Sequence, residues 1–445
     1  MKRLVFPESL FSYLRDGLFH DTSIESCAVL FLGKSVDEDR THYLVREIVL
    51  APPEAYTQRT ASAAELKSTF VATLVSRARK TGLTICFVHT HVGLSTSAPE
   101  FSWVDDQGEQ RLLPMLELRT GTREHLALVM SRNGMAARIM GTPHHVEVRR
   151  VGSRVVSASF RSLAEDSRAR YDRQIRAFGQ DGQYVLAHQT VAIVGVGGTG
   201  SHVAQALAYL GVENLVLVDY DTVAETNLNR LVGATHADIG NLKTAVAANY
   251  IRHINPRAHV RIISGDVTQG SVGRALRHVD FVFGCTDSHG SRAVLNQLAY
   301  QYLVPVIDMG VSLGGPEGGA LRITGRVQML APGLGCMVCG DLLDYDHVRW
   351  DLMNETEKRA DPYFIGPGEP APAVISINGT VASLAVTMFL SAVLGIGSNA
   401  RLQILDGSRG TVRAAQISPI GGCVVCSMAG SFARGDSVEL LHGMD

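Results

Sequence analysis

The chain has 445 residues, of which 46% are hydrophobic and 19% are charged, so it can bury more than one core and is not generally disordered. Its formal net charge is -2 and it has no long run of lysine or arginine, which argues against nucleic acid or an acidic membrane surface as the main partner. The N-terminus lacks the continuous apolar segment of a signal peptide, and the longest apolar stretch, 381–394, falls short of the ~20 residues that a membrane span needs. We therefore expect a cytoplasmic protein in which residues 381–394 form a buried helix.

Residues 1–150 alternate short strand-like runs with helical stretches, which predicts an N-terminal α+β domain. The expected strands lie at 27–33, 42–50 and 83–91, and the longest expected helix lies at 62–79. Residues 151–170 are rich in arginine and serine and carry little periodicity, so we expect a linker there.

Strands and helices alternate regularly in residues 171–430, with a C-terminal tail at 431–445. The expected elements lie at 191–196, 201–210, 214–220, 243–254, 260–266, 281–287 and 304–311. This alternation predicts an α/β domain with a Rossmann-like, doubly wound and mostly parallel sheet.

A glycine-rich turn follows the first strand of this second domain and contains Gly195, Gly197, Gly198 and Gly200. Gly195 permits a tight turn, Gly197 lets the backbone approach a phosphate, and Gly200 allows close packing of the helix on the strand. Asp219 ends the next strand, where a carboxylate can bind ribose hydroxyls. The turn alone fits NAD or FAD as well as ATP, and it could also be purely structural.

Further motifs accompany the glycine turn in a fixed order: Arg170-Tyr-Asp-Arg173-Gln, Asp219-Tyr-Asp221, Asn227-Leu-Asn-Arg230, Lys243 and Cys285-Thr-Asp287. Together they resemble the ubiquitin-activating enzyme superfamily, which includes the bacterial ThiF-type adenylyltransferases of thiamine and molybdopterin synthesis. The resemblance covers about residues 168–427. It implies ATP-dependent adenylation of the C-terminal glycine of a ubiquitin-like or sulfur-carrier protein.

Adenylation concentrates negative charge at the α-phosphate of ATP, so its site needs cations and a carboxylate that binds a metal ion. The resemblance implies that Asp287 holds Mg²⁺ and that Arg230 and Lys243 contact the phosphates. It also implies that Asp219 holds the ribose and that Asn227 belongs to the phosphate site. Asp221 joins the nucleotide-binding set as its weakest member, because an Asp just after a strand is often only a turn residue.

Arg173 is expected to reach the nucleotide site of the other subunit across a homodimer interface, again from the resemblance. Taken singly, each of these charged residues could equally be a solvated surface charge or a helix cap. Their joint occurrence favours a site. Oxidoreduction with NAD would leave Arg230, Lys243 and Asp287 without a task, so it is disfavoured.

Two C-x-x-C pairs, Cys336/Cys339 and Cys423/Cys426, lie in the second domain. Each pair offers two thiolates from one tight turn, and four thiolates can close a structural Zn²⁺ site. A redox-active pair would leave the second pair unexplained. Residues 341–380, where thioester-forming activating enzymes commonly have a cysteine, contain none. We expect the chain to stop at the acyl-adenylate.

The N-terminal domain carries a second candidate metal set. His89 and His91 end one strand with a spacing of two, so both imidazoles project from the same face and can bind one metal ion. With Ser102, Asp105 and the earlier Glu25, they resemble the JAMM (MPN-domain) zinc metalloproteases, which remove ubiquitin-like proteins by hydrolysis.

The JAMM resemblance implies that the two histidines and Asp105 bind Zn²⁺, that Glu25 is the general base and that Ser102 steadies the oxyanion. The interval between His91 and Ser102 is longer than is usual in that family, and Val92 stands where a proline is expected. Ser102 and Asp105 can alternatively form a helix cap, and Asp106 is the substitute ligand if the register differs by one residue.

Two overall functions remain open at this point. In the first, a peptidase that matures or deconjugates a ubiquitin-like protein is fused to the enzyme that adenylates it, with an E2-like conjugating protein as a further partner. In the second, the chain activates a sulfur carrier for cofactor or cysteine synthesis, a sulfur donor is the further partner, and the N-terminal domain only docks the carrier.

Overall fold

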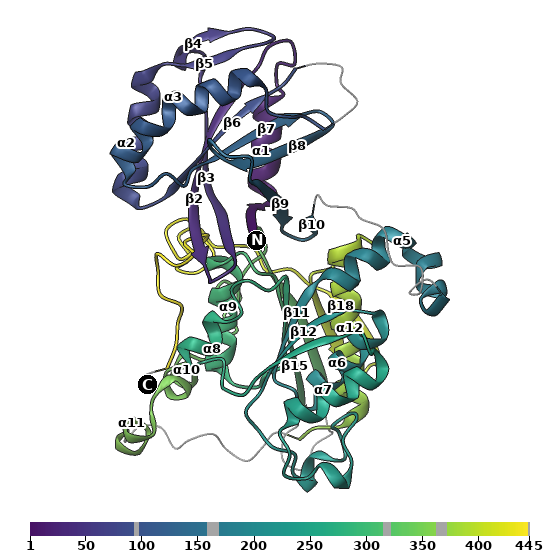
Figure 1. The fold of residues 1–445 in the computed structure, drawn as a ribbon. Coiled ribbons are helices and arrows are strands. Elements are labelled where there is room, and N and C mark those ends of the chain that lie inside the picture. The colour runs from purple at the N-terminus through teal and green to yellow at the C-terminus, as the bar shows by residue number, and fades with distance from the viewer. Residues whose placement is uncertain (93–97, 158–168, 315–321, 362–371, 444–445) are drawn as a thin grey trace. The chain divides into compact units, whose positions relative to one another are not determined.

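The computed structural model describes residues 1–92, 98–157, 169–314, 322–361 and 372–443. The chain divides into two compact units (Figure 1). Unit 1 consists of Met1–Gly152, Val156–Ser159 and Phe432–Glu439, and unit 2 consists of Ser153–Val155, Phe160–Ser431 and Leu440–Asp445. We describe each unit by itself.

Unit 1 is built on an eight-stranded mixed sheet in the order β1-β3-β2-β6-β7-β8-β9-β10. Its strands are β1 (Lys2–Pro7), β2 (Cys27–Val36), β3 (Thr41–Leu50), β6 (Thr84–Thr90), β7 (Leu126–Ser131), β8 (Gly134–Ile139), β9 (His145–Val151) and β10 (Val155–Ser157). A further parallel pairing joins β1 to β9 and closes the sheet on itself. The expected strands at 27–33, 42–50 and 83–91 thus correspond to β2, β3 and β6.

Both faces of this sheet are covered by helices of unit 1. Helix α1 (Glu8–Leu18) packs Phe11, Leu14 and Leu18 into one core cluster. Helices α2 (Ser68–Thr81) and α3 (Trp103–Thr120) contribute to the other cluster. Two short strands, β4 (Tyr56–Arg59) and β5 (Ala64–Leu66), form a separate hairpin, preceded by the short helix η1 (Pro53–Ala55).

The expected helix at 62–79 was wrong at its start. Residues 64–66 pair with β4 as strand β5, and the helix begins only at Ser68. It continues to Thr81 and ends at Gly82, whose φ of 67° is the left-handed conformation that closes many helices. Strand pairing outside the segment therefore overrode the helical preference of its first residues.

Unit 2 has an eight-stranded sheet in the order β13-β12-β11-β14-β15-β16-β17-β18. Its strands are β11 (Thr190–Val194), β12 (Asn214–Val218), β13 (His259–Ile263), β14 (Phe281–Gly284), β15 (Val306–Gly314), β16 (Arg322–Leu330), β17 (Leu402–Asp406) and β18 (Thr411–Ala414). The pairings from β13 to β15 are parallel, whereas those from β15 to β18 are antiparallel. The sheet is therefore mixed, with a Rossmann-like parallel part where the alternation predicted one.

Helices cover both faces of the unit 2 sheet, as a doubly wound fold requires (Figure 1). The helices are α5 (Asp172–His188), α6 (Gly198–Leu210), α7 (Lys243–Ile254), α8 (Gly270–Arg274), α9 (His289–Gln301), α10 (Tyr345–Leu352), α11 (Glu355–Ala360) and α12 (Ile375–Leu394), with short turns η2 (Glu225–Asn227) and η3 (His236–Asp238). Helices α6, α7 and α12 pack on one face of the sheet, where Phe281, Phe283 and Phe389 meet in the core.

Helix α12 has the length and apolar composition of a membrane span, and 56% of its most apolar window is buried inside the structure. The buried core helix of a soluble protein can have the same length and apolar composition. Val381, Ala385 and Phe389 are fully buried in the core of unit 2.

Residues 432–439 of the C-terminal tail belong to unit 1. Gly435 forms a parallel bridge with Lys34 of β2, and the Asp436 carboxylate accepts the backbone N–H of Val36 at 2.7 Å. A side chain at Gly33 would collide with the carbonyl of Ala433, so glycine there permits the close approach of the tail.

Candidate functional site

The glycine turn of unit 2 joins the carboxyl end of β11 to the N-terminus of α6. Gly195 has a φ of 85°, which only glycine adopts at little cost, and a Cβ atom at Gly200 would lie 1.9 Å from the Gly195 carbonyl oxygen. A Cβ atom at Gly197 would meet nothing within 4 Å. The turn therefore leaves open space beside Gly197 at a helix N-terminus, where backbone N–H groups attract anions.

Asp219 ties the end of β12 to this turn. Its Oδ2 accepts the backbone N–H of Val196 at 2.7 Å, and its Oδ1 accepts that of Asp221 at 2.8 Å. Burial raises the pKa of the Asp219 carboxyl. Because each carboxylate oxygen has a second lone pair, Asp219 can still accept hydrogen bonds from two ribose hydroxyls.

Lys243 and Asp221 form an ion pair at the start of α7. The Lys243 Nζ lies 2.6 Å from Asp221 Oδ2, and the Lys243 backbone N–H donates to the Asp221 carbonyl at 2.9 Å. The Lys243 side chain is only 12% exposed, whereas that of Asp221 is 52% exposed. Asp221 thus holds the ammonium group of Lys243 in place rather than merely forming a turn.

Arg230 lies beside the glycine turn. A Cβ atom at Gly198 would come within 3.6 Å of the Arg230 Cδ. Its Nη1 donates to the Thr226 carbonyl at 2.6 Å, which holds the guanidinium group. Asn227 instead uses its side-chain oxygen to accept the Ala224 N–H at 3.0 Å, so in this structure it caps the short helix η2.

Asp287 follows β14 and is exposed. Its two predecessors approach the glycine turn, because a Cβ atom at Gly195 would lie 2.8 Å from the Cys285 carbonyl and 3.2 Å from the Thr286 side chain. Asp287 therefore leaves the sheet at the same edge as the turn.

Arg173 is exposed on α5, and no ion pair of its side chain occurs among the described residues.

Sequence reasoning missed two polar features of this region. Asn378 is 4% exposed on α12, and its amide nitrogen would lie 2.3 Å from a Cβ atom at Gly198. A single asparagine in the apolar stretch of α12 was the signal that could have found it. The second feature is Asp308, which is 1% exposed and pairs with Arg326 at 2.6 Å and with Arg292 at 3.4 Å.

The four cysteines of the two C-x-x-C pairs come together in unit 2. Sulfur-to-sulfur distances are 3.6 Å for Cys336–Cys339, 3.6 Å for Cys336–Cys423 and 3.4 Å for Cys339–Cys426. A tetrahedron with Zn–S bonds of about 2.3 Å has edges of about 3.8 Å, so the sulfur atoms fit a zinc ion. Hydrogen bonding, above all from Cys426, lowers the pKa of Cys336, whereas the pKa values of Cys339 and Cys426 are raised, so the four coupled thiols share their protons unequally.

His89, His91 and Asp105 form the corresponding cluster in unit 1. The ligand atoms of the three residues all lie within 4.8 Å of one another. His89 Nε2 lies 3.1 Å from His91 Nε2 and 3.0 Å from Asp105 Oδ1, and His91 Nε2 lies 3.7 Å from Asp105 Oδ2. Two imidazoles and one carboxylate that converge on one position are a ligand set that suits zinc. They would leave one coordination position of the ion open.

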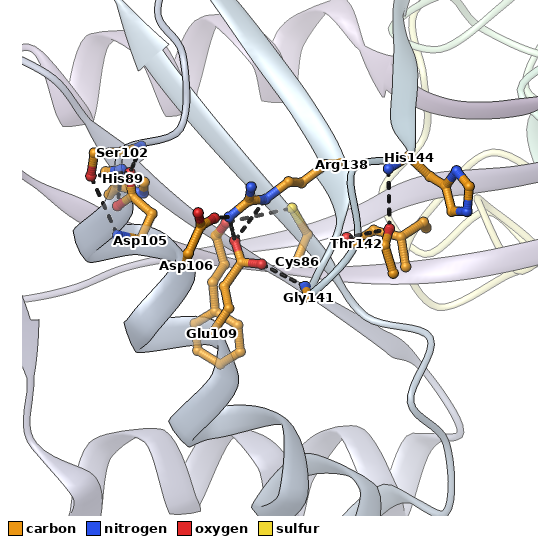
Figure 2. A network of polar contacts seen from close by, with 12 residues as sticks. Cys86, His89, Ser102, Asp105, Asp106, Glu109, Arg138, Gly141, Thr142 and His144 are labelled. Carbon is orange, nitrogen blue, oxygen red and sulfur yellow. Dashed lines mark hydrogen bonds and ion pairs between the residues drawn. The ribbon is translucent and has the colours of Figure 1, made fainter.

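Asp105 also caps helix α3. Ser102 Oγ accepts the Asp105 backbone N–H at 3.3 Å, and Asp105 Oδ2 accepts the Ser102 backbone N–H at 2.6 Å, so the capping box and the metal cluster coexist (Figure 2). Burial opposes ionisation of Asp105, but hydrogen bonds from His89 and His91 hold its pKa far below the usual range. Asp106 pairs with Arg138 at 2.7 Å, so Asp105 rather than the substitute Asp106 faces the histidines.

Glu25 stands just before β2, whose first residue Cys27 pairs with His89 on β6. The Glu25 side chain is in a buried position, and this burial raises its pKa while the charges of His89 and His91 lower it. Its backbone carbonyl accepts Arg59 Nε at 2.9 Å, which fixes the segment. A carboxylate beside such a cluster can accept a proton from a water molecule in the site.

Zinc content tests both clusters. We expect the purified protein to carry two zinc ions per chain, one for each ligand cluster. Replacing Cys336 by serine removes one thiolate from the four-cysteine set, and replacing His91 by alanine removes one imidazole from the other, so each variant should keep one zinc ion. Elemental analysis checks this. A single zinc in the wild-type protein that disappears in Cys336→Ser would show that the histidine cluster holds none.

The model of the ThiF family matches residues 171–424, which lie in unit 2. The chain is also similar to the adenylyltransferase and sulfurtransferase MOCS3 of Drosophila willistoni, with 29% identity over 287 residues that cover 63% of this chain and 58% of that protein. It is 33% identical over 167 residues to the molybdopterin-synthase adenylyltransferase of Escherichia coli K12, covering 37% of this chain and 64% of that one. The chain thus covers less than two thirds of the length of these relatives.

Among solved structures, the crystal structure of E. coli MccB with MccA-N7isoASN is similar at 21% identity and a TM-score of 0.48. That similarity covers 58% of this chain and 75% of the other.

Proposed function

The chain belongs to the ThiF family, and we propose that its unit 2 uses ATP to adenylate the C-terminal carboxylate of a small carrier protein. The observation that carries this proposal is the open glycine turn at the N-terminus of α6, with Asp219 bonded to it and Arg230 and Asp287 beside it. This edge of the sheet offers hydrogen-bond acceptors for a ribose and cations and backbone N–H groups for phosphates.

The residues of this site divide the task by charge. Arg230 and Lys243 would neutralise the phosphate oxygens as negative charge builds up at the α-phosphorus, and Asp219 would orient the nucleoside. Asp287 is an exposed carboxylate at the same edge and fits a magnesium ion, which would neutralise phosphate charge when bound. Arg173, exposed on α5, would reach the site of a second copy in a homodimer.

ATP–pyrophosphate exchange tests the adenylation directly. With candidate carriers that end in Gly-Gly, exchange of labelled pyrophosphate into ATP should depend on the carrier and on Mg²⁺. The same carriers with an amidated C-terminus are the matched control, since an amide cannot attack the α-phosphate. Exchange that is equally fast with the amidated carriers would contradict the proposal.

We favour a sulfur carrier over a conjugated ubiquitin-like protein as the substrate. The names of the two relatives above include a sulfurtransferase activity and molybdopterin synthase. A sulfur donor would then attack the acyl carbon of the adenylate, forming a carbon–sulfur bond and releasing AMP. A neighbouring gene for an E2-like conjugating protein would instead favour ligation.

We expect no thioester between the carrier and this chain. Burial raises the pKa of Cys27 to about 12 and also raises the pKa values of Cys86 and Cys285, which disfavours the reactive thiolate at all three positions. Incubation with ATP, Mg²⁺ and the carrier should release pyrophosphate without a thiol-sensitive adduct on non-reducing gels. An adduct that is absent in Cys285→Ser would make Cys285 the nucleophile and refute this expectation.

A second function, metal-dependent hydrolysis of a peptide or isopeptide bond by unit 1, is favoured by the convergence of His89, His91 and Asp105. A bound zinc ion would supply Lewis acidity at the scissile carbonyl. Glu25 would take a proton from the attacking water. Ser102 Oγ donates to Asp105 Oδ2 at 2.7 Å, so its hydroxyl must rotate before it can donate to an oxyanion.

The alternative for unit 1 is a module that only docks the carrier. Hydrolysis and docking differ in one measurable respect, because a docking module binds the carrier without cutting it. A carrier extended beyond Gly-Gly by a short peptide is a suitable probe for both.

A further inference from the structure

A network of charged side chains lies beside the histidine and aspartate cluster of unit 1 (Figure 2). Its centre is Arg138 on β8, which donates from Nη2 to Asp106 Oδ1 at 2.7 Å and to Glu109 Oε1 at 2.9 Å. Its Nε also donates to Glu109 Oε1, at 3.1 Å. The other oxygen of Glu109 accepts the backbone N–H of Gly141 at 2.6 Å. Neither the nucleotide site nor the metal ligands include Arg138.

Burial makes this network expensive unless it is complete. Glu109 is 6% exposed and the Arg138 side chain is 12% exposed, and a buried charge is tolerated only when it is paired and hydrogen-bonded. Both Glu109 oxygens have donors, so the requirement is met. The pair therefore fixes one relative position of helix α3 and strand β8.

That position determines where Asp105 points. Asp106 follows Asp105 in the first turn of α3, and Glu109 lies one turn further along the same helix. Arg138 on β8 forms ion pairs with both Asp106 and Glu109. Strand β8 pairs with β7, and β7 pairs with β6, the strand that carries His89. A rotation of α3 would break both ion pairs and turn Asp105 away from the histidines.

An aromatic contact extends the same link. The Arg138 guanidinium carbon lies 4.0 Å from the centre of the Phe101 ring, and the Phe101 ring meets the His89 ring edge-on at 6.4 Å between centres. A cation is attracted to the face of an aromatic ring, so this contact adds to the link between Arg138 and the segment that precedes α3. Arg138 thus contacts Phe101, just before the helix cap Ser102, as well as Asp106 and Glu109 within α3.

We propose that Arg138 is a positioning residue for the metal centre of unit 1. By holding Asp106 and Glu109 it sets the first turn of α3 so that Asp105 completes the ligand set with His89 and His91. This inference rests on the proposed metal centre. It adds a residue that touches neither the metal ion nor a substrate.

Zinc affinity in the full chain tests the inference. Arg138→Gln should weaken zinc binding at the histidine cluster by about 10- to 100-fold, as loss of supporting contacts around metal ligands typically does. Competition with a chromophoric chelator measures this. The four-cysteine zinc is an internal control and should be released at the same chelator concentration as in the wild type. Arg111→Gln, an exposed arginine on α3, is the matched control and should leave both sites unchanged.

Asp106→Asn supplies a second variant, because it removes only the more exposed ion pair and leaves the buried Arg138–Glu109 pair intact. This variant should fold and should lose less zinc affinity than Arg138→Gln. Its zinc affinity therefore tests the role of Arg138 even if Arg138→Gln does not fold. Wild-type zinc affinity at the histidine cluster of folded Arg138→Gln would refute the role of Arg138. If Arg138→Gln does not fold, wild-type zinc affinity in Asp106→Asn would refute it instead. Either result would leave the proposed metal centre itself standing. A wild-type chain that binds only the cysteine zinc would overturn the metal centre itself.

Discussion

Replacing Asp287 by asparagine is expected to lower carrier-dependent ATP–pyrophosphate exchange by at least about 100-fold, the usual effect of removing one group that stabilises transition-state charge. Asp287 is an exposed carboxylate beside the glycine turn. Its side chain makes no hydrogen bond or ion pair among the described residues. The loss should therefore appear in the rate of exchange and not in stability. Exchange at saturating ATP and carrier, together with thermal unfolding, separates the two.

Asp181→Asn is the matched control for this measurement, since it changes an exposed carboxylate on α5 in the same way. Arg230→Ala should reproduce the loss, because the cation beside Gly198 is removed. If Asp287→Asn exchanges pyrophosphate at the wild-type rate, the assignment of the magnesium-binding carboxylate is wrong, although the fold of unit 2 is untouched.

The parallel part of unit 2 could be predicted because its signals are local. Strand β11, the glycine turn and α6 follow one another within a single stretch of chain, and the expected helix at 243–254 is α7. Each element carries its own periodicity and its own turn residues, so no knowledge of distant contacts was needed.

The antiparallel half of that sheet could not be predicted in the same way. Asp308 and Arg326 meet only because β15 and β16 pair in a register that sets Asp308 opposite Gln328. The sequence places these residues far apart and gives neither a motif. The same holds for Arg138 and Glu109, which become partners only when α3 packs on the sheet of unit 1.

The candidate metal cluster of unit 1 lies between these extremes. The spacing of His89 and His91 predicted a shared face, and the S-x-x-D pattern predicted the helix start at Ser102. The resemblance assigned Asp105 as the third ligand and kept Asp106 as the substitute if the register differed by one residue. In the structure Asp106 pairs with Arg138, whereas Asp105 lies beside the two imidazoles.

Glu25→Gln is expected to reduce cleavage of a carrier extended beyond Gly-Gly by about 100- to 10,000-fold, because the side chain that accepts a proton from the attacking water is lost. Glutamine has nearly the same shape, so the Glu25 backbone carbonyl should still accept Arg59 and the segment before β2 should keep its place. The two imidazoles and Asp105 are unchanged, and zinc content should remain at the wild-type value. Mass spectrometry of the cleaved peptide measures the rate.

The matched control is Glu65→Gln, which changes an exposed carboxylate on β5 and should cleave like the wild type. Exchange of pyrophosphate by unit 2 should be the same in both variants, since its residues are not altered. Undiminished cleavage by Glu25→Gln would refute the role of Glu25 as general base. A zinc-loaded wild-type chain that binds the extended carrier but leaves it uncut would favour docking, and the histidine cluster would then serve to hold α3 against the sheet rather than to hydrolyse a bond.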